Sequence, residues 1–230
     1  MPILDLLASS SLGSLLGMRH ALEPDHLAAV TTLVSRERST LRGAWLGLCW
    51  GLGHTASLVV VGVILVILRT EMPASLTSAF EFGVALMLVG LGVRAIVLAA
   101  RQGPDGPLRL HRHGGIVHSH TTGATHVHIG DWTLARRPLL VGAVHGLAGS
   151  GALTALVLTT IPTNAARVTY LVLFGLGSTL GMAALSGLLG WPLARLGTHH
   201  AFTRGVSLVV GCATTALGIA WGYPVVAQLF

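Results

Sequence analysis

Six apolar runs dominate the sequence, and each is long enough to cross the hydrocarbon core of a lipid bilayer as a helix, which takes about 20 residues. Hydrophobic residues make up 52% of the chain and charged residues only 10%, a balance unlike that of soluble domains. Because polar backbone groups inside a bilayer must be paired within helices or closed barrels, the runs predict an all-α, polytopic membrane protein with six transmembrane helices. The runs cover approximately residues 3–34, 43–68, 77–100, 138–161, 167–193 and 202–228.

The arginines predict how these helices are oriented. They concentrate in three segments between apolar runs, whereas only Arg69 and Arg167 mark the other side. By the positive-inside rule the three segments face the cytoplasm, so both termini lie outside. Arginines spread in this way, without a basic stripe or aromatic platforms, argue against nucleic acid as a partner. The three segments carry Arg36, Arg38 and Arg42, then Arg101, Arg109, Arg112, Arg136 and Arg137, then Arg195 and Arg204.

The chain also carries a weak internal repeat. Three short stretches match stretches 125, 124 and 122 residues further on, in the same order. Such a series indicates a duplicated three-helix unit, residues 1–100 and 137–230. Three crossings end on the far side of the membrane, so the second unit inserts upside down, and inverted repeats around a midplane site are typical of transporters. The matched stretches are 17–22 with 142–147, 51–55 with 175–179 and 80–84 with 202–206.

Residues 101–136 separate the two units and differ from both. Pro104, Gly106 and Pro107 interrupt any helix there, and half of the chain's 12 histidines follow among glycine, serine and threonine. Neutral imidazoles bind borderline divalent ions, so we predict a flexible cytoplasmic loop that binds metal loosely. The alternative is a polar linker of biased composition. The loop histidines are His111, His113, His118, His120, His126 and His128.

Residues 20–26 read His-Ala-Leu-Glu-Pro-Asp-His, and they lie inside the first apolar run. Ionisable side chains at membrane depth mark functional sites, and a metal ion is the simplest ligand that offsets their burial. In a regular helix at about 100° per residue, Asp25 and His26 point about 140° and 240° away from His20, so the three cannot converge. Pro24 lacks an N–H and collides with the carbonyl of His20, so we predict a helix break. Irregular backbone at this depth is tolerated where it lines a cavity.

Two histidines and an aspartate, His20, Asp25 and His26, then offer nitrogen and oxygen ligands. This set suits Ni²⁺, Co²⁺, Zn²⁺ or Cu²⁺ better than Mg²⁺ or Ca²⁺. His54 is the predicted fourth ligand or a residue that supports the ligands. The glycines around it let its helix approach another backbone closely, which would bring His54 against the broken first helix; the alternative is a hydrogen bond to another helix. Glu23, Thr55, His145 and Ser178 are candidates for lining the pathway or supporting the ligands, and His145 is aligned with His20 by the repeat.

The spacing His20-x4-Asp25-His26 resembles the signature of the nickel/cobalt transporter family, and Leu52-Gly53-His54-Thr55 resembles its second motif. The chain length and the His-rich loop are similar to those of the shorter bacterial members, which include nickel permeases found with urease genes and nickel/cobalt efflux proteins. The resemblance implies a multi-pass protein of the bacterial inner membrane, with Ni²⁺ or Co²⁺ as its transported substrate and no organic cofactor.

Two other classes of protein fit parts of the pattern. His20-x4-Asp25 also matches the dyad of glycerolipid acyltransferases, in which the histidine is a general base. That enzyme needs a catalytic domain at the membrane surface, and no segment outside the membrane is longer than the His-rich loop, so we predict that the chain is not an enzyme. A metal-sensing or accessory membrane subunit is the stronger alternative, since it would keep the site without a continuous pathway.

The sequence therefore predicts a secondary permease for divalent transition-metal ions. No phosphate-binding nucleotide motif is present, so an ion gradient, the membrane potential or a partner must drive transport. Uptake is favoured over efflux. The expected partners are the metal ion and the bilayer, and the further candidates are a second copy of the chain or a cytoplasmic metallochaperone.

Overall fold

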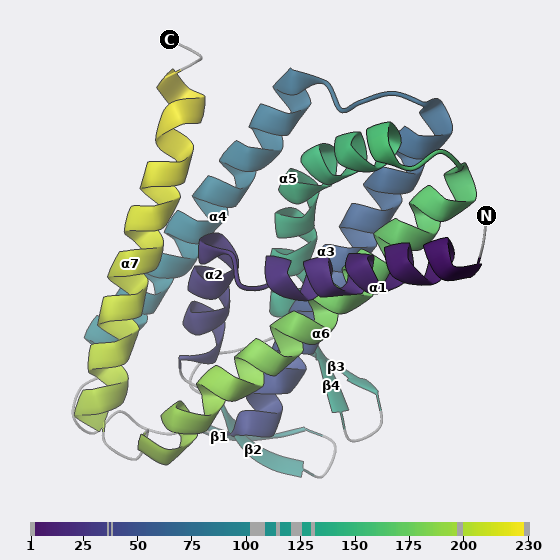
Figure 1. Ribbon diagram of the computed structural model, residues 1–230. Coiled ribbons are helices and arrows are strands. Elements are labelled where there is room, and N and C mark those ends of the chain that lie inside the picture. The colour runs from purple at the N-terminus through teal and green to yellow at the C-terminus, as the bar shows by residue number, and fades with distance from the viewer. Residues whose placement is uncertain are drawn as a thin grey trace.

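A computed structural model describes residues 3–35, 37, 39–101, 109–113, 116–120, 126–129, 132–196 and 200–227. Across these residues the fold is a bundle of seven helices with two short β-hairpins at one end (Figure 1). The helices are α1 Ile3–His20, α2 Pro24–Val34, α3 Thr40–Leu68, α4 Ala74–Arg101, α5 Arg136–Thr160, α6 Asn164–Leu196 and α7 His200–Ala227.

The first apolar run is divided into two helices. α1 ends at His20, and Pro24 is the first residue of α2, after a residue with extended backbone, Glu23. Proline at the start of a helix loses no hydrogen bond, because its missing N–H would have had no partner there. The break therefore lies where Pro24 predicted it, but the run 3–34 is not one continuous helix.

Four helices in the described part of the chain are long and apolar enough to cross a membrane: α3, α4, residues 164–192 of α6 and residues 201–227 of α7. The predicted six spans are not confirmed. Pro24 divides the first run into α1 and the shorter α2. α5 is not among the four helices found within the described residues.

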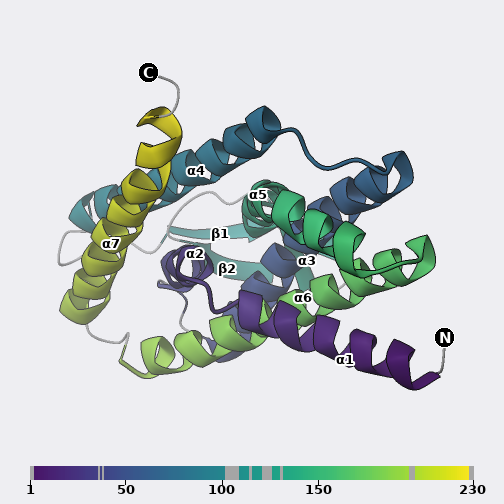
Figure 2. The same cartoon turned by 45° about the horizontal axis from the view of Figure 1, so that its top comes forward.

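α3 lies at the centre of the bundle, packed along α5 and α6, while α1 packs along α6. α4 and α7 form a second pair beside them, and α2 lies against α7 (Figures 1 and 2). Glycine permits the closest crossings. A methyl group on Gly17 of α1 would collide with the carbonyl of Phe174 in α6, and one on Gly142 of α5 would collide with the carbonyl of Trp50 in α3. Small residues at such crossings let helix backbones touch.

Two buried apolar clusters stabilise the bundle on either side of its polar interior. The first surrounds α2 and the second joins α3, the end of α5 and the start of α6. Outward positions such as Val60, Ile64 and Val209 are exposed, as expected for helices whose outer faces contact lipid. The first cluster comprises Ala21, Ala29, Val30, Val34, Trp50, Val84, Leu88 and Met182; the second comprises Leu58, Val66, Val157, Tyr170, Leu171 and Phe174.

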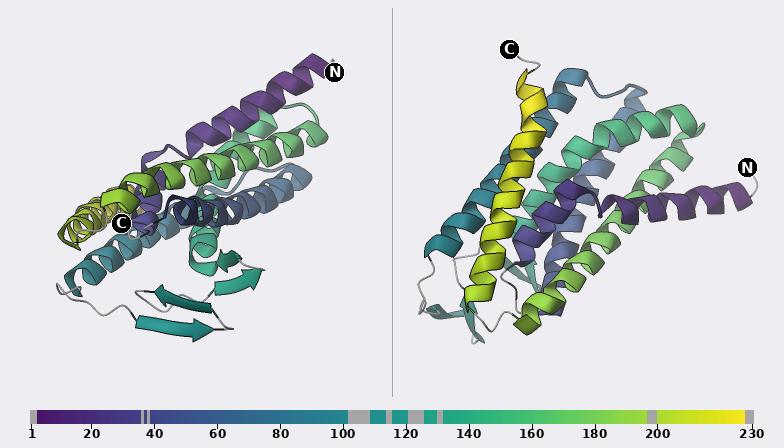
Figure 3. Two further views of the ribbon diagram at one scale, coloured as in Figure 1. Left: turned by 90° about the horizontal axis from the view of Figure 1, so that it is seen from below. Right: turned by 60° about the vertical axis from the view of Figure 1, so that its left-hand side comes forward.

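The segment between α4 and α5 contains short strands where the sequence predicted a flexible loop. β1 Arg109–His113 pairs with β2 Ile116–His120, and β3 His126–Ile129 pairs with β4 Trp132–Ala135, both antiparallel. Both hairpins lie at the end of the bundle where α5 begins, away from the C-terminus (Figures 1 and 3). The remaining predicted loop positions between 102 and 131, together with Arg36 and Arg38, lie outside the described residues.

Candidate metal site

The break between α1 and α2 brings the imidazole rings of His20 and His26 close together, in an edge-on arrangement. His20 is the last residue of α1 and His26 is the third of α2, and their ring centroids are 4.4 Å apart. The backbone N–H of Glu23 donates to the His20 carbonyl at 3.0 Å, so this carbonyl keeps a partner despite Pro24. The turn thus achieves the convergence that a regular helix would prevent.

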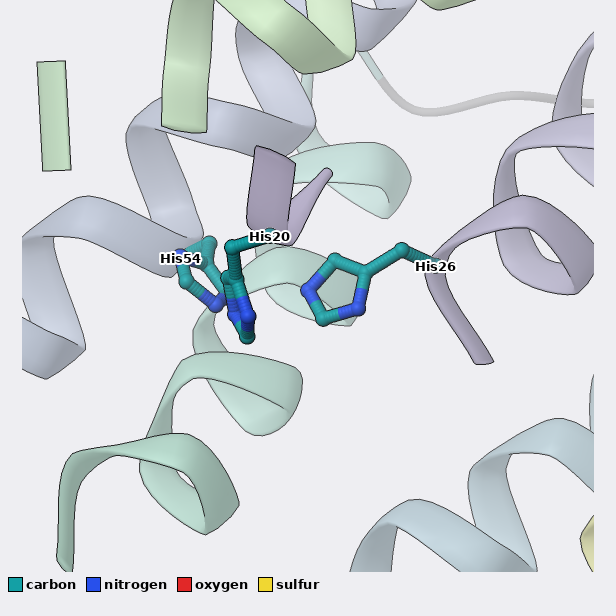
Figure 4. Close-up of side chains that lie close together, drawn as sticks. All are labelled: His20, His26 and His54. Carbon is teal, nitrogen blue, oxygen red and sulfur yellow. The ribbon is translucent and has the colours of Figure 1, made fainter. Parts of the chain in front are cut away.

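His54 of α3 completes a group of three imidazoles. Its ring centroid lies 5.3 Å from those of both His20 and His26, and the three side chains converge on one space (Figure 4). One ligand atom from each ring lies within 4.8 Å of the others. Among the described residues, His20 Nε2, His26 Nε2 and both nitrogens of His54 are buried without a hydrogen-bond partner. Unsatisfied buried polar atoms are rare in native proteins, so their grouping here points to a missing ligand.

Asp25 lies behind this group and links it to α5. Its Oδ1 accepts a hydrogen bond from His26 Nδ1 at 3.1 Å, and its Oδ2 accepts one from His145 Nε2 at 2.7 Å. A carboxylate can only accept, so both histidines donate. Because Nδ1 of His26 then carries the proton, its Nε2 keeps a lone pair for a metal. Carboxylates support metal-binding histidines in this way in many proteins.

The histidines at the centre are deeply buried. His26, His54 and His145 are at most 2% exposed, and Asp25 is 7% exposed. His20 is nearer the surface, and its Nδ1 lies 2.9 Å from Glu23 Oε1, whose side chain is half exposed. The site therefore has a buried side at α3 and α5 and an accessible side at the turn between α1 and α2.

The structure brings together all four predicted ligands, His20, Asp25, His26 and His54. His145, predicted to line the pathway, contacts Asp25 directly. The other candidates take different positions, and the six loop histidines fall on β1, β2 and β3 at the end of the bundle. Glu23 pairs with His20, Thr55 donates to the carbonyl of Gly175 at 2.7 Å and contacts Thr179 Oγ1 at 2.8 Å, and Ser178 is buried with its Oγ unpartnered in the described structure.

Two aromatic residues at the site escaped the sequence analysis. The ring of Phe174 lies 5.3 Å from that of His20, and the ring of Trp50 lies 5.4 Å from that of His26. Each directly precedes a Gly-Leu-Gly stretch, 51–53 or 175–177, that the internal repeat aligns. A search for aromatic residues at equivalent positions of the repeat would have found both.

The sequence has relatives among known proteins. It is 31% identical over 223 residues to the urease accessory protein UreH of Bacillus sp. (strain TB-90), covering 95% of this chain and 92% of that protein. It is 30% identical over 117 residues to the high-affinity nickel transport protein of Cupriavidus necator, covering 48% of this chain and 33% of that protein. It is 27% identical over 192 residues to the chloroplast protein FOR GROWTH AND FERTILITY 1 of Arabidopsis thaliana, covering 80% of this chain and 50% of that protein.

No solved structure matches the chain significantly. The family model described as high-affinity nickel-transport protein matches residues 6–227, which is nearly the whole sequence. The two histidine motifs, their convergence between apolar helices and this match agree with one another, and the chain belongs to the family of high-affinity nickel-transport proteins.

Proposed function

We propose that this chain is a secondary permease that carries Ni²⁺ or Co²⁺ across the bacterial inner membrane, in the direction of uptake. The observation that carries the proposal is the group of three buried imidazoles with unpartnered nitrogens, His20, His26 and His54. The family is one of transport proteins rather than enzymes, which agrees with the prediction against an acyltransferase. The name of the relative from Cupriavidus necator supports nickel as the substrate.

The ion is bound by Nε2 of His20, Nε2 of His26 and a nitrogen of His54. Asp25 holds His26 in the orientation that this requires, so its main contribution is to position a ligand. Imidazole ligands suit Ni²⁺, Co²⁺, Zn²⁺ and Cu²⁺, and affinity generally rises from Co²⁺ to Ni²⁺ to Cu²⁺. Ion choice therefore depends on the fit of the site as well as on ligand type.

The two halves of the chain form inverted repeats, as their helix crossings support. Gly17 meets Phe174 where α1 crosses α6, and the equivalent residues Gly142 and Trp50 meet where α5 crosses α3. The alignment offsets of 125 and 124 residues relate the two contacts. A second pair behaves in the same way: Gly177 meets the carbonyl of Ser14, and Gly53 meets that of Leu139. An approximate two-fold axis near the Thr55–Thr179 contact accounts for all of these contacts.

The His-rich hairpins face the cytoplasm, and both termini lie outside. The arginines at 101, 109, 112, 136 and 137 support this orientation, because they flank or lie within the hairpins. In this orientation the loop histidines can receive imported metal and pass it to a metallochaperone. A membrane potential of 100 mV contributes about 4.6 kcal/mol to the entry of a divalent ion, at about 2.3 kcal/mol per charge.

Flux assays in proteoliposomes test this function. The purified chain is reconstituted, and the entry of radiolabelled Ni²⁺ and Co²⁺ is measured with an imposed potential of either sign, with Zn²⁺ and Cu²⁺ as competitors. We expect flux that reverses with the potential and is lost in His54→Ala. Ser186→Ala is the matched control, because Ser186 is also fully buried but packs against Gly47, outside the histidine group. If the chain bound Ni²⁺ without carrying it across the membrane, the proposal of a permease would be overturned, and the chain would be a sensing subunit instead.

A further inference from the structure

His26 belongs to two groups of metal-binding side chains. The first is His20, His26 and His54, and the second is Asp25, His26 and His145. Within each group, one ligand atom per residue lies within 4.8 Å of the others. The ring of His26 lies between them, with its centroid 4.4 Å from that of His20 and 4.1 Å from that of His145.

The two nitrogens of His26 face different groups. Nδ1 lies 3.1 Å from Asp25 Oδ1, while Nε2 has no partner in the described structure and belongs with the free nitrogens of His20 and His54. We infer that a transported ion occupies two adjacent positions in succession, first among His20, His26 and His54 and then among Asp25, His26 and His145. This inference rests on the proposed function, and it makes His145 a ligand during part of the transport cycle.

Burial gives the order of the two positions. The side chain of His20 is 15% exposed and pairs with the half-exposed Glu23, so the first position is the accessible one. The side chains of Asp25 and His145 are 9% and 2% exposed, so the second position is the more enclosed. Two divalent ions this close repel strongly, and they would share one imidazole, so the positions are filled one after the other.

The second position is closed by a hydrogen bond that an ion can replace. His145 Nε2 donates to Asp25 Oδ2 at 2.7 Å, and this nitrogen must give up its proton before it binds a metal. His145 Nδ1 is buried and unpartnered in the described structure, so it can hold the proton in the other tautomer. The proton on His26 Nδ1 can pass in the same way to His26 Nε2, which becomes free when the ion leaves the first position. The carboxylate of Asp25 then compensates the ion's charge, which the three neutral imidazoles of the first position cannot do.

The step also moves the ion between the two halves of the chain. The first position joins α1, α2 and α3, whereas the second joins α2 and α5. α3 and α5 touch directly here, since a methyl group on Gly146 would collide with the carbonyl of His54. The ion therefore leaves His20 on α1 and His54 on α3 and gains Asp25 on α2 and His145 on α5. His26 of α2 holds it in both positions.

Two substitutions at residue 145 distinguish a ligand from a residue that only orients Asp25. His145→Gln keeps an N–H that can donate to Asp25 but removes the imidazole, and His145→Ala removes both. We expect Ni²⁺ still to bind both variants at the first position, and flux in proteoliposomes to fall in both by about 10- to 100-fold. Recovery of flux in His145→Gln would reduce His145 to a positioning residue and overturn the second position. Loss of equilibrium Ni²⁺ binding in both variants would also overturn the second position. His145 would then belong to the one site at which the ion binds, and no separate first position would remain.

X-ray absorption of bound Ni²⁺ tests the second position without any transport. We expect three imidazoles around Ni²⁺ in the intact chain, two imidazoles and a carboxylate in His54→Ala, and no tight site in His54→Ala/His145→Ala. Equal binding by the single and double variants, or a His54→Ala spectrum without a carboxylate, would overturn the inference. Absence of flux in the intact chain, by contrast, contradicts the proposed function alone. Ser186→Ala, with the spectrum and flux of the intact chain, controls for changes in packing.

Discussion

The α1–α2 region and α5 come from aligned sequences but differ in their backbones. At the offset of 125 residues, His145 matches His20 and Gly149 matches Pro24. α1 ends at His20 and α2 begins at Pro24, whereas α5 continues unbroken from Arg136 to Thr160. Glycine keeps its N–H and can remain within a helix, while proline cannot. The comparison teaches that each region can bring one histidine to the site, but only the broken one brings a second histidine and an aspartate with it.

We expect the largest effect at His26, which has no histidine counterpart in α5. His26→Ala removes a side chain that serves both metal groups, so we expect Ni²⁺ uptake into proteoliposomes to fall to background while the protein still inserts. Ser186→Ala is the control, because Ser186 is also fully buried but packs against Gly47, outside the histidine group. Uptake by His26→Ala at the control rate would remove His26 from the assigned site.

Changing the proline tests whether the break itself is needed. Pro24→Ala restores an N–H and lets α1 continue toward α2, which would turn His26 away from His20. We expect the Ni²⁺ affinity, measured by calorimetry in detergent, to fall about tenfold, or about 1.4 kcal/mol. Pro224→Ala within α7 is the control, since this proline is remote in sequence from the break. Equal affinities in the two variants would show that the histidines converge without the proline.

The two equivalent crossings provide a third test, on stability. Gly17→Ala and Gly142→Ala each push a methyl group into a carbonyl of the facing helix. We expect both to lower the free energy of unfolding by a similar amount, about 1–3 kcal/mol, measured as loss of thermal stability in detergent. Gly83→Ala is the matched control, because nothing lies within 4 Å of its added methyl group. If only one of the two variants lost thermal stability, the two halves of the chain would not be equivalent.

The smallest expected effect is at the centre of the repeat. Thr55 and Thr179 are equivalent residues whose hydroxyls lie 2.8 Å apart. Replacing either by valine removes an interhelical hydrogen bond, which contributes about 0.6 kcal/mol on average in a membrane protein. A double-mutant cycle on thermal stability measures this coupling. We expect a small favourable value, and a coupling of zero would mean that this contact does not hold the halves together.

Local chemistry made much of the site predictable. Proline at position 24 can only start a helix or break one, so the position of the break followed from one residue. The glycines at 51 and 53 predicted that His54 lies against the broken first helix. The ring of His54 does lie 5.3 Å from that of His20, but Gly51 and Gly53 contact α6 and α5 instead. The sequence also indicated the family, and the match over residues 6–227 confirms it.

What the sequence did not predict depends on contacts between distant segments. The hydrogen bond between His145 and Asp25 joins residues 120 positions apart, and it exists because α2 and α5 meet behind the site. The approach of Trp50 and Phe174 to the histidines depends on helix crossings in the same way. The short strands between residues 109 and 135 were missed because histidine, glycine and serine favour no regular structure strongly. Apolar length alone also did not reveal that Pro24 divides the first run into two helices.

The glycine crossings change how a map of harmful substitutions in this protein should be interpreted. In most proteins the positions least tolerant of change mark either a large apolar core or the residues that touch the substrate. Here a methyl group added at Gly17, Gly53, Gly142 or Gly177 would collide with the backbone of a facing helix, although none of these residues has a side chain that could bind metal. Variants at these positions would lose transport through misfolding. Lower amounts of protein in the membrane would distinguish them from variants that fold but no longer bind the metal ion.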